Sequence, residues 1–545
     1  MADEEHIEAM VFEPETGSEA LAGYIASKFE SVESSRLEEE ERWLNAYRQY
    51  RGLYGNETQF TSTEKSKVFI KITKTKVLAA YGQIIDVLFA GQRFPLGVDS
   101  TLIPEGVEDA VHFDPKDDAN ALDELQSKYG FPGDGAELPP GATSQMLDDL
   151  NLGVFSEELG ELGDKLRPGI GKTPTSQTYH PAETAAKRME KKMLDQLEES
   201  SASKHLRHTA FEMALFGTGV LKGPFAYDKE YPNWDEEGNY SPIIKTVPKV
   251  ENVSLWNLYP DSDAKNMDEC EFVIQRHRLS FSELRNLKKR PYFRHDAIDT
   301  AVSMGTNYVR KWWEADLEDY RNSYDVERFE ILEFWGNIDK GSAEEAGLEI
   351  PTELEDLDTL QVNCWVCHNQ IIRLVINPFT PKRIPYFAAP YELNPYSFFG
   401  VGLAENMTDT QALMNGFMRM AVDNAVLSGN LIFEIDETNL VPGQDLELYP
   451  GKVFRRQGGA PGQSLFGTKY PNVSQENMMM FDKARQLADD ATGIPSYSHG
   501  QTGVQGTGRT AAGISMLMGA AQISIKGVVK NIDDYLLQPL GEAFY

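Results

Sequence analysis

The sequence predicts a helix-rich, mixed α+β fold built from more than one structural region. Apolar residues recur at helical spacing in several long charged segments, the first of which is residues 18–54. Segments of β-like pattern interrupt the helices, most clearly at residues 326–338 and 361–377. The chain has 545 residues, of which 41% are hydrophobic, so it is too long for one core and apolar enough for several.

Two helices are predicted in the N-terminal region. The second covers residues 67–90, and neither helix has a strict heptad, so we expect them to pack on partners rather than form a coiled coil. From Asp99 to Pro181 the sequence becomes acidic and rich in glycine and proline, which favours a solvent-facing insertion. The apolar positions of the first helix are Leu21, Ile25, Phe29, Val32, Leu37, Trp43, Leu44 and Tyr47.

Helical patterning returns at residues 181–216. The sequence "GTGV" that follows is expected to end this helix and to begin a strand, and β-rich sequence continues to Ala264. Ser280 and Glu283 have the spacing of a capping box, which predicts a new helix from residue 281. A further helix is expected after Pro291, reaching Tyr320.

The second half of the chain is predicted to alternate strands and helices. Residues 326–338 are predicted as one strand and residues 361–377 as one or two more, with an acidic loop at residues 340–358 between them. Residues 384–402 lead into a helix. The predicted helices are residues 403–430, 474–493 and 510–538, and the predicted short strands are "LIFEID" (431–436) and "GKVFRR" (451–456).

The charge balance limits the functions that the chain can have. Asp and Glu number 85 against 52 Lys and Arg, which gives a formal net charge of −33 and a pI of about 4.7. A chain this acidic cannot wrap nucleic acid through a general basic field. No segment has the length of a membrane span, and the acidic N-terminus lacks the pattern of a signal peptide. With three cysteines, we expect a protein made in a reducing cytosol and no membrane partner.

Residues Gly503–Thr510, "GVQGTGRT", differ from a phosphate-binding P-loop only by Arg509 in place of lysine. The context is unfavourable, because a P-loop follows a buried strand and the preceding segment here is helical. The best candidate for a magnesium-binding acid, Asp436, lies upstream rather than downstream. A nucleotide-binding protein that uses Gly503–Thr510 is therefore kept only as an alternative.

The sequence "CWVCH" at Cys364–His368 is a second motif with possible chemistry. It matches the haem-attachment pattern and resembles a redox dithiol. The surrounding pattern is β-like, whereas a redox dithiol lies at a helix N-terminus, and Cys364, Cys367 and His368 supply at most three of the four ligands of structural zinc. Two cysteines in a hairpin strand are the favoured interpretation. A thiol or metal protein is the second alternative, and no cofactor or metal is expected.

A glycine-rich loop at residues 493–510 joins two predicted helices. It contains no acid, and its ionisable side chains are His499 and Arg509. Neutral polar side chains on a glycine-rich backbone can touch a polyanion without gripping it, and an exposed hinge is the other interpretation. Its glycines are Gly493, Gly500, Gly503, Gly506 and Gly508, and its polar side chains include Ser498, His499, Gln501, Thr502, Gln505, Thr507 and Arg509.

The order of these elements resembles the portal (head-to-tail connector) proteins of tailed bacteriophages, especially the short-tailed type. The resemblance covers most of the chain and rests on the order and spacing of five segments. They are "ERWLNAYRQYRGLY" (41–54), "FEMALFGTGVLKGPF" (211–225), "VSLWNLYPDSDAKNMDECEFVIQRHRLSFSELRNL" (253–287), "PYFAAPYELNPYSFFGVGLAENMTDTQALMNGFMRMAVDN" (385–424) and "ATGIPSYSHGQTGVQGTGRTAAGISMLM" (491–518).

This resemblance implies a non-enzymatic ring of twelve subunits around a DNA channel at one capsid vertex, assembled in the host cytoplasm. The ring would pass double-stranded DNA without sequence preference, dock terminase and then the tail adaptor, and contact capsid and scaffolding proteins. By likeness, the parts are an N-terminal wing part (1–98), an acidic insertion (99–181), an α/β wing (182–280), a first stem helix (281–322), a clip (323–398), a second stem helix (399–430), a wing return (431–492), a tunnel loop (493–510) and a tunnel-lining wing helix (511–545). The loop side chains named above then become candidate DNA contacts.

Overall fold

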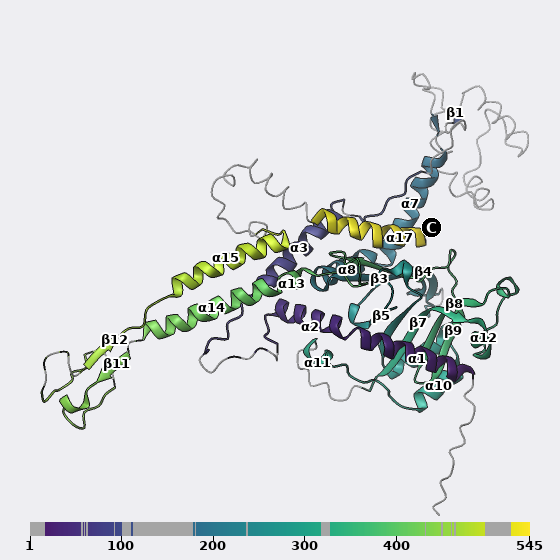
Figure 1. The fold of residues 1–545 in the computed structure, drawn as a ribbon. Coiled ribbons are helices and arrows are strands. Elements are labelled where there is room, and N and C mark those ends of the chain that lie inside the picture. The colour runs from purple at the N-terminus through teal and green to yellow at the C-terminus, as the bar shows by residue number, and fades with distance from the viewer. Residues whose placement is uncertain are drawn as a thin grey trace, which may run out of the picture. The chain divides into compact units, whose positions relative to one another are not determined.

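The computed structural model contains helices and several antiparallel sheets, so the mixed α+β class is confirmed (Figure 1). The chain divides into two compact units, residues 1–96 with 195–545, and residues 97–194. The structure describes residues 17–55, 58, 60, 64–91, 93–100, 111–112, 178–179, 181–235, 238–317, 327–430, 432–447, 449, 451–458, 460, 462, 465–495 and 525–544.

The larger unit contains a five-stranded antiparallel sheet whose strands follow one another along the chain. In its register, Cys364 lies opposite Phe334 on one neighbouring strand and Leu374 on the other. The strand predicted at residues 326–338 is confirmed as part of this sheet, and residues 361–377, predicted to hold one or two strands, contain parts of two. Its strands are β5 (Leu258–Pro260), β6 (Phe272–Leu279), β7 (Phe329–Asp339), β8 (Thr359–Cys367) and β9 (Gln370–Ile376).

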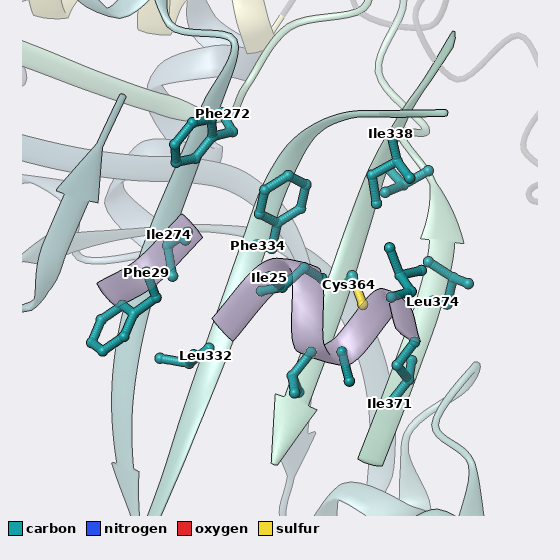
Figure 2. Packing of buried hydrophobic residues seen from close by; sticks show 14 of the residues in the cluster. Ile25, Phe29, Phe272, Ile274, Leu332, Phe334, Ile338, Cys364, Ile371 and Leu374 are labelled. Atoms are coloured by element: carbon teal, nitrogen blue, oxygen red, sulfur yellow. The ribbon is translucent and has the colours of Figure 1, made fainter. Parts of the chain in front are cut away.

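One face of this sheet is covered by α1 (Gly17–Ser35), as Figure 2 shows. The helix buries Leu21, Ile25, Phe29 and Val32, which recur every three or four residues and therefore lie on one side. Ile25 and Phe29 belong to the same cluster as residues from all five strands, and each fully buried side chain contributes roughly 1.5–3 kcal/mol. The apolar period found in the sequence is thus what fixes α1 to the sheet.

The opposite face is covered by two short helices, α9 (Phe281–Asn286) and α10 (His295–Ser303). The predicted capping box is confirmed, because the Ser280 side chain accepts from the Glu283 amide and the Glu283 side chain accepts from the Ser280 amide. The long helix expected from Pro291 to Tyr320 is wrong. The backbone of Phe293 instead forms an isolated β-bridge with Arg373 on β9. Helix α10 then ends before Gly305, whose φ is +88°.

The helix expected over residues 18–54 is confirmed from Gly17 to Arg51 with an interruption at Arg36, between α1 and α2 (Leu37–Arg51). The Arg36 side chain is 2% exposed and donates to the carbonyl oxygens of Leu255, Trp256 and Leu258. It also pairs with Glu40 at 2.8 Å. This buried contact is non-local, so the helical pattern of the segment could not predict the break.

A three-stranded sheet, in the order β10-β3-β4, packs against α8 (Ala202–Phe216). The expected change from helix to strand at "GTGV" is confirmed, since α8 ends at Gly217 and β3 begins at Thr218. The helix expected over residues 181–216 is interrupted at Ser201, which has a φ of 58°. The strands are β3 (Thr218–Tyr231), β4 (Ile243–Val253) and β10 (Tyr386–Pro390), the last lying in a segment not predicted as strand.

Two backbone segments cross at glycines beside this sheet. An added Cβ on Gly217 would lie 2.3 Å from the carbonyl oxygen of Gly400, and one on Gly400 would lie 2.6 Å from the carbonyl oxygen of Gly217. An added Cβ on Gly402 would lie 2.7 Å from the Leu215 carbonyl oxygen. The absence of side chains at these positions is what allows α8 to meet the segment before α13 (Leu403–Asn406).

The chain then forms a helical hairpin. Helix α14 (Thr408–Gly429) packs against α15 (Ser474–Thr492), and β11 (Ile432–Ile435) pairs antiparallel with β12 (Leu465–Thr468) at the far end (Figure 1). The predicted strand "LIFEID" is confirmed. The predicted strand "GKVFRR" is wrong, because only Arg456 makes an isolated bridge, to Leu440.

Several shorter elements complete the larger unit, and the smaller unit has few described residues. Residues 525–532 are helical and continue through a π-helical turn into α17, so the final predicted helix is confirmed where it is described. The smaller unit contains the pair β1 (Val111–His112) and β2 (Thr178–Tyr179) and most of α7 (Pro181–Glu199). The remaining elements are α3 (Ile72–Leu88), η1 (Leu255–Asn257), η2 (Met267–Glu269), η3 (Leu287–Lys289), α11 (Glu314–Leu317), α12 (Lys340–Glu345, within the segment expected as an acidic loop), η4 (Thr352–Leu354), η5 (Glu437–Asn439), the π turn (Asp533–Leu537) and α17 (Gln538–Phe544).

Candidate functional site

The glycine-rich loop begins at a fixed point at the end of α15. Gly493 ends the helix in the left-handed conformation, with φ 63°, and Ile494 is fully buried. Lys76 on α3, only 1% exposed, donates from Nζ to the Ile494 carbonyl oxygen and to the Asp489 carboxylate. Burial lowers the pKa of Lys76, and Asp489 opposes this by stabilising the charged amine.

Of the glycines and polar side chains predicted for the loop, the structure places only Gly493. Ser498, His499, Gly500, Gln501, Thr502, Gly503, Gln505, Gly506, Thr507, Gly508 and Arg509 lie outside the described residues. The last element described before Gly503–Thr510 is the helix α15, which ends at Thr492, rather than the buried strand that a P-loop requires. Asp436 lies in an exposed turn, where Thr438 and Asn439 donate to its carboxylate.

A buried polar network fixes the base of the hairpin to α3. The Gln411 side chain accepts from the amide of Thr73 at 3.1 Å and from its hydroxyl at 3.0 Å. Its Nε2 donates to the Ile70 carbonyl oxygen at 2.7 Å and to Asn415 Oδ1 at 3.0 Å. The amide of Thr73, in the first turn of α3, has no partner within the helix, so Gln411 satisfies a donor that would otherwise be buried and unpaired.

Sequence reasoning missed both buried anchors, although one signal was available. Lys76 follows Thr73 and precedes Ala80 and Ile84 at helical spacing, so it lies on the buried side of α3. A lysine in that position predicts a buried partner for its amine. Gln411 offers no comparable signal, since glutamine is common on exposed helix faces.

The two helices of the hairpin expose many large apolar side chains. Single exposed apolar residues are ordinary, whereas several on each helix of a packed pair indicate a contact surface. The exposed residues are Leu413, Met420, Val426 and Leu427 on α14, and Met478, Met479, Met480 and Leu487 on α15.

Apolar side chains are also exposed at the distal part of the hairpin, residues 430–473. Tyr449, Val453 and Phe466 are the most exposed of them, and the sequence of this part is close to charge balance, with five acidic and four basic residues. An exposed surface that mixes aromatic, aliphatic and charged side chains is typical of a protein-contact surface. The other exposed large apolar residues here are Ile432, Leu446, Tyr470 and Val473.

The "CWVCH" motif does not form a metal or redox site. Cys364 packs in the core under α1, whereas Cys367 packs in the core under α9 and α10, so the two thiols lie on opposite faces of β8. Burial raises the pKa of each thiol to about 12. His368 occupies the turn after β8 with φ 53°, and its Nε2 lies 2.9 Å from the Gly305 carbonyl oxygen.

Other kinds of site are also missing from the part of the chain that the structure describes. No three His, Cys, Asp or Glu side chains within it are grouped so as to hold a metal ion. No described helix is both long enough and apolar enough to cross a membrane. The notable features are therefore the anchored loop and the exposed hairpin rather than a catalytic centre.

Comparison with known families agrees with these features. A family model described as "Phage SU10 portal protein" matches residues 163–545. The matched region includes the hairpin, with Gln411 on α14 and the Lys76 partners Asp489 and Ile494, and the glycine-rich loop. SU10 is a short-tailed phage, as the resemblance of the sequence segments indicated. Because the match spans more than half of the chain, the chain belongs to the phage SU10 portal protein family, whose members are structural, non-enzymatic, virion-associated proteins.

Proposed function

We propose that the chain assembles into a ring of twelve subunits whose central channel conducts double-stranded DNA during packaging and ejection. The family match carries this proposal. The net charge of −33 supports it, because a conduit must not hold DNA strongly along its whole surface. The ring would sit at the capsid vertex, with capsid and scaffolding proteins around it.

The subunit contacts of this ring are assigned to the helical hairpin. The apolar side chains exposed along α14 and α15 need cover, and a neighbouring copy of the same chain provides it at every position of a closed ring. Exposed apolar residues lie on both helices, which supports contacts with two neighbouring subunits, because each subunit of a closed ring has a neighbour on either side.

The hairpin also supports a revised assignment of stem and clip. The resemblance calls for two helices that enclose a strand-containing insertion. The part of residues 281–322 that the structure describes, up to residue 317, contains only short helices, and β7 to β10 within residues 323–398 belong to core sheets. Helices α14 and α15 enclose β11 and β12, so we assign them to the stem and residues 430–473 to the clip, which would dock terminase and then the tail adaptor.

The tunnel loop is proposed to be residues 493–510. Its first residues follow directly from the proposed stem helix α15 and are anchored by Lys76. The candidate DNA contacts are Ser498, His499, Gln501, Thr502, Gln505, Thr507 and Arg509, and residues 511–545 would line the channel beyond them.

The first test is the mass and shape of the purified chain by light scattering and negative-stain imaging. We expect rings with a central hole, with a mass that is a multiple of 61.2 kDa. Leu427→Asp with Met479→Asp should abolish the rings, whereas Met304→Asp, at an exposed residue outside the hairpin, should not. Rings formed equally well by the double variant would contradict the hairpin assignment.

The second test replaces residues 500–508 with an acidic segment of equal length. The expected result is normal rings that package or retain DNA poorly in a phage assembly assay, because added carboxylates repel the phosphate backbone. Unimpaired packaging and retention would show that these residues do not face the DNA.

A further inference from the structure

A concentrated basic surface lies on the layer that covers the β5–β9 sheet opposite α1. Residues 285–294, "RNLKKRPYFR", contain five basic residues and no acidic one, in a chain whose acids outnumber its bases by 85 to 52. The segment includes the end of α9, all of η3 and the turn before α10. We call these ten residues the basic segment.

The backbone of the basic segment is held firmly against the sheet. Leu287 and Phe293 are buried in the core shared with Trp365 and Cys367. The amide of Arg294 donates to the Ile372 carbonyl oxygen at 2.8 Å, and the Arg294 guanidinium donates to the Ala346 carbonyl oxygen at 2.8 Å. These contacts fix where the exposed side chains between them are presented.

Two of the five basic side chains form no ion pair, hydrogen bond or ring contact with the residues that the structure describes. Lys288 pairs with Asp299, and Arg285 stacks over Phe281 with the guanidinium carbon 4.2 Å from the ring centre. Lys289 and Arg290 are exposed and make no ion pair with any residue that the structure describes.

An exposed aromatic side chain follows these two cations in the sequence. Tyr292 is 74% exposed and has φ 66°, a left-handed conformation that a tyrosine rarely adopts. The nearest acids in sequence are Glu283, which caps α9, and Asp296 and Asp299 on α10, so the basic character ends at the start of α10. The segment therefore presents two unpaired cations, Lys289 and Arg290, and an exposed tyrosine on a backbone that is held against the sheet.

We propose that Lys289, Arg290 and Tyr292 contact the phosphate backbone of double-stranded DNA outside the glycine-rich loop. Exposed Lys and Arg side chains are the usual phosphate contacts, and a tyrosine hydroxyl also donates to phosphate oxygens. Two or three such contacts give weak, sequence-independent and salt-sensitive binding through counterion release. The choice of DNA as the polyanion rests on the proposed function, but the contact itself needs no channel.

The experiment measures binding of the full chain to a fluorescently labelled mixed-sequence duplex by anisotropy, between about 50 and 200 mM salt. The test variant is Lys289→Glu with Arg290→Glu, and a second variant with glutamine at both positions removes charge without reversing it. The matched control is Lys204→Glu with Arg207→Glu, which changes two exposed cations on α8 by the same amount. Thermal melts and negative-stain images are recorded for each protein.

We expect the glutamine variant to reduce the slope of log affinity against log salt by about 2, and the glutamate variant to bind roughly tenfold more weakly or worse, while the control binds as wild type. The proposal is overturned if wild type does not bind the duplex at low salt, or if both variants keep its affinity and slope. It is also overturned if the variants lose rings but bind DNA normally, because the segment is then a subunit contact. Absence of rings in wild type would contradict the proposed function but not the DNA contact, which is measured separately by anisotropy.

Discussion

Lys222 on β3 and Glu333 on β7 form a buried ion pair with 2.6 Å between Nζ and Oε2, and this pair joins the two main sheets. His277 on β6 lies 2.6 Å from the same carboxylate oxygen, and Trp335 donates from Nε1 to the other. Burial alone would raise the pKa of Glu333, but Lys222 and His277 outweigh it and hold the pKa well below the usual range of a glutamate.

Removing one partner of this pair should strongly destabilise the fold. Lys222→Met leaves a buried carboxylate without its cation, and Glu333→Gln leaves a buried ammonium, so either change should cost roughly 3–5 kcal/mol of the free energy of unfolding. Urea denaturation measures it. The control is Lys530→Met, whose exposed pair with Asp534 should contribute nothing measurable. Equal effects at the two sites would contradict the importance of burial.

The carboxyl group of Glu212 on α8 should make stability depend on pH near neutrality. Burial raises its pKa to about 7, against hydrogen bonds from Asn252, Ser254 and Leu255 that lower it, and its Oε2 has no partner. An acid whose pKa is raised in the folded state favours folding when protonated, so wild type should lose stability as the pH rises from about 4.3 to 7.

Glu212→Gln removes this titration and provides the measurement. Thermal melts across pH 4 to 8 should show the variant gaining on wild type as the pH rises, by on the order of 3 kcal/mol at the alkaline end. Parallel curves for the two proteins would show that the group is not protonated in the folded state at neutral pH.

The anchor of the loop can be tested by changing two neighbouring aspartates. Asp489→Ala removes the carboxylate partner of the buried Lys76 amine, which should lower the free energy of unfolding by about 2–3 kcal/mol. Asp490→Ala changes an exposed carboxylate one residue later and should have little effect. If both variants melt alike, Lys76 does not depend on Asp489.

The three cysteines should be unreactive in the native protein. Burial raises the pKa of Cys270, Cys364 and Cys367 to about 12, so few thiolates are present at pH 8. A colorimetric thiol reagent should label almost nothing before denaturation and three equivalents in guanidinium chloride. Rapid labelling of two equivalents in the native protein would mean that Cys364 and Cys367 share an accessible site.

The glycine crossing should tolerate no side chain. Gly400→Ala would place a Cβ 2.6 Å from the Gly217 carbonyl oxygen and 2.7 Å from that of Glu392, so the backbone must move at a cost of about 1–3 kcal/mol or more. Gly82→Ala is the control, because its Cβ meets open space within α3 and should stabilise by roughly 0.5–1 kcal/mol. Thermal melts that rank the two variants in the opposite order would contradict the crossing.

Local chemistry in the sequence predicted the features that depend on neighbouring residues. The capping box of Ser280 and Glu283, the helix end at Gly217 and the period of α1 each involve residues within one or two turns. The break at Arg36 and the turn at Phe293 depend on partners more than 70 positions away, at Leu255 and Arg373, so no local pattern contains them.

The candidate site was predictable to a similar extent. The end of α15 at Gly493 and the start of the loop follow from the sequence. The pairing of α14 with α15 and the anchoring of Ile494 by Lys76 are tertiary contacts, and helical periodicity gives the face of each helix but not its neighbour. The loop residues from Ser498 to Arg509 stay predictions.

The crossing of Gly217 with Gly400 also restricts how this sequence can change over time. An ordinary core contact can drift, because a larger residue on one side can be accepted when a smaller one appears opposite. Here both positions already hold the smallest residue, so neither can compensate for the other. Glycine is therefore required at both positions at once. The long stretch of chain between them can gain or lose loops as long as it returns to this crossing.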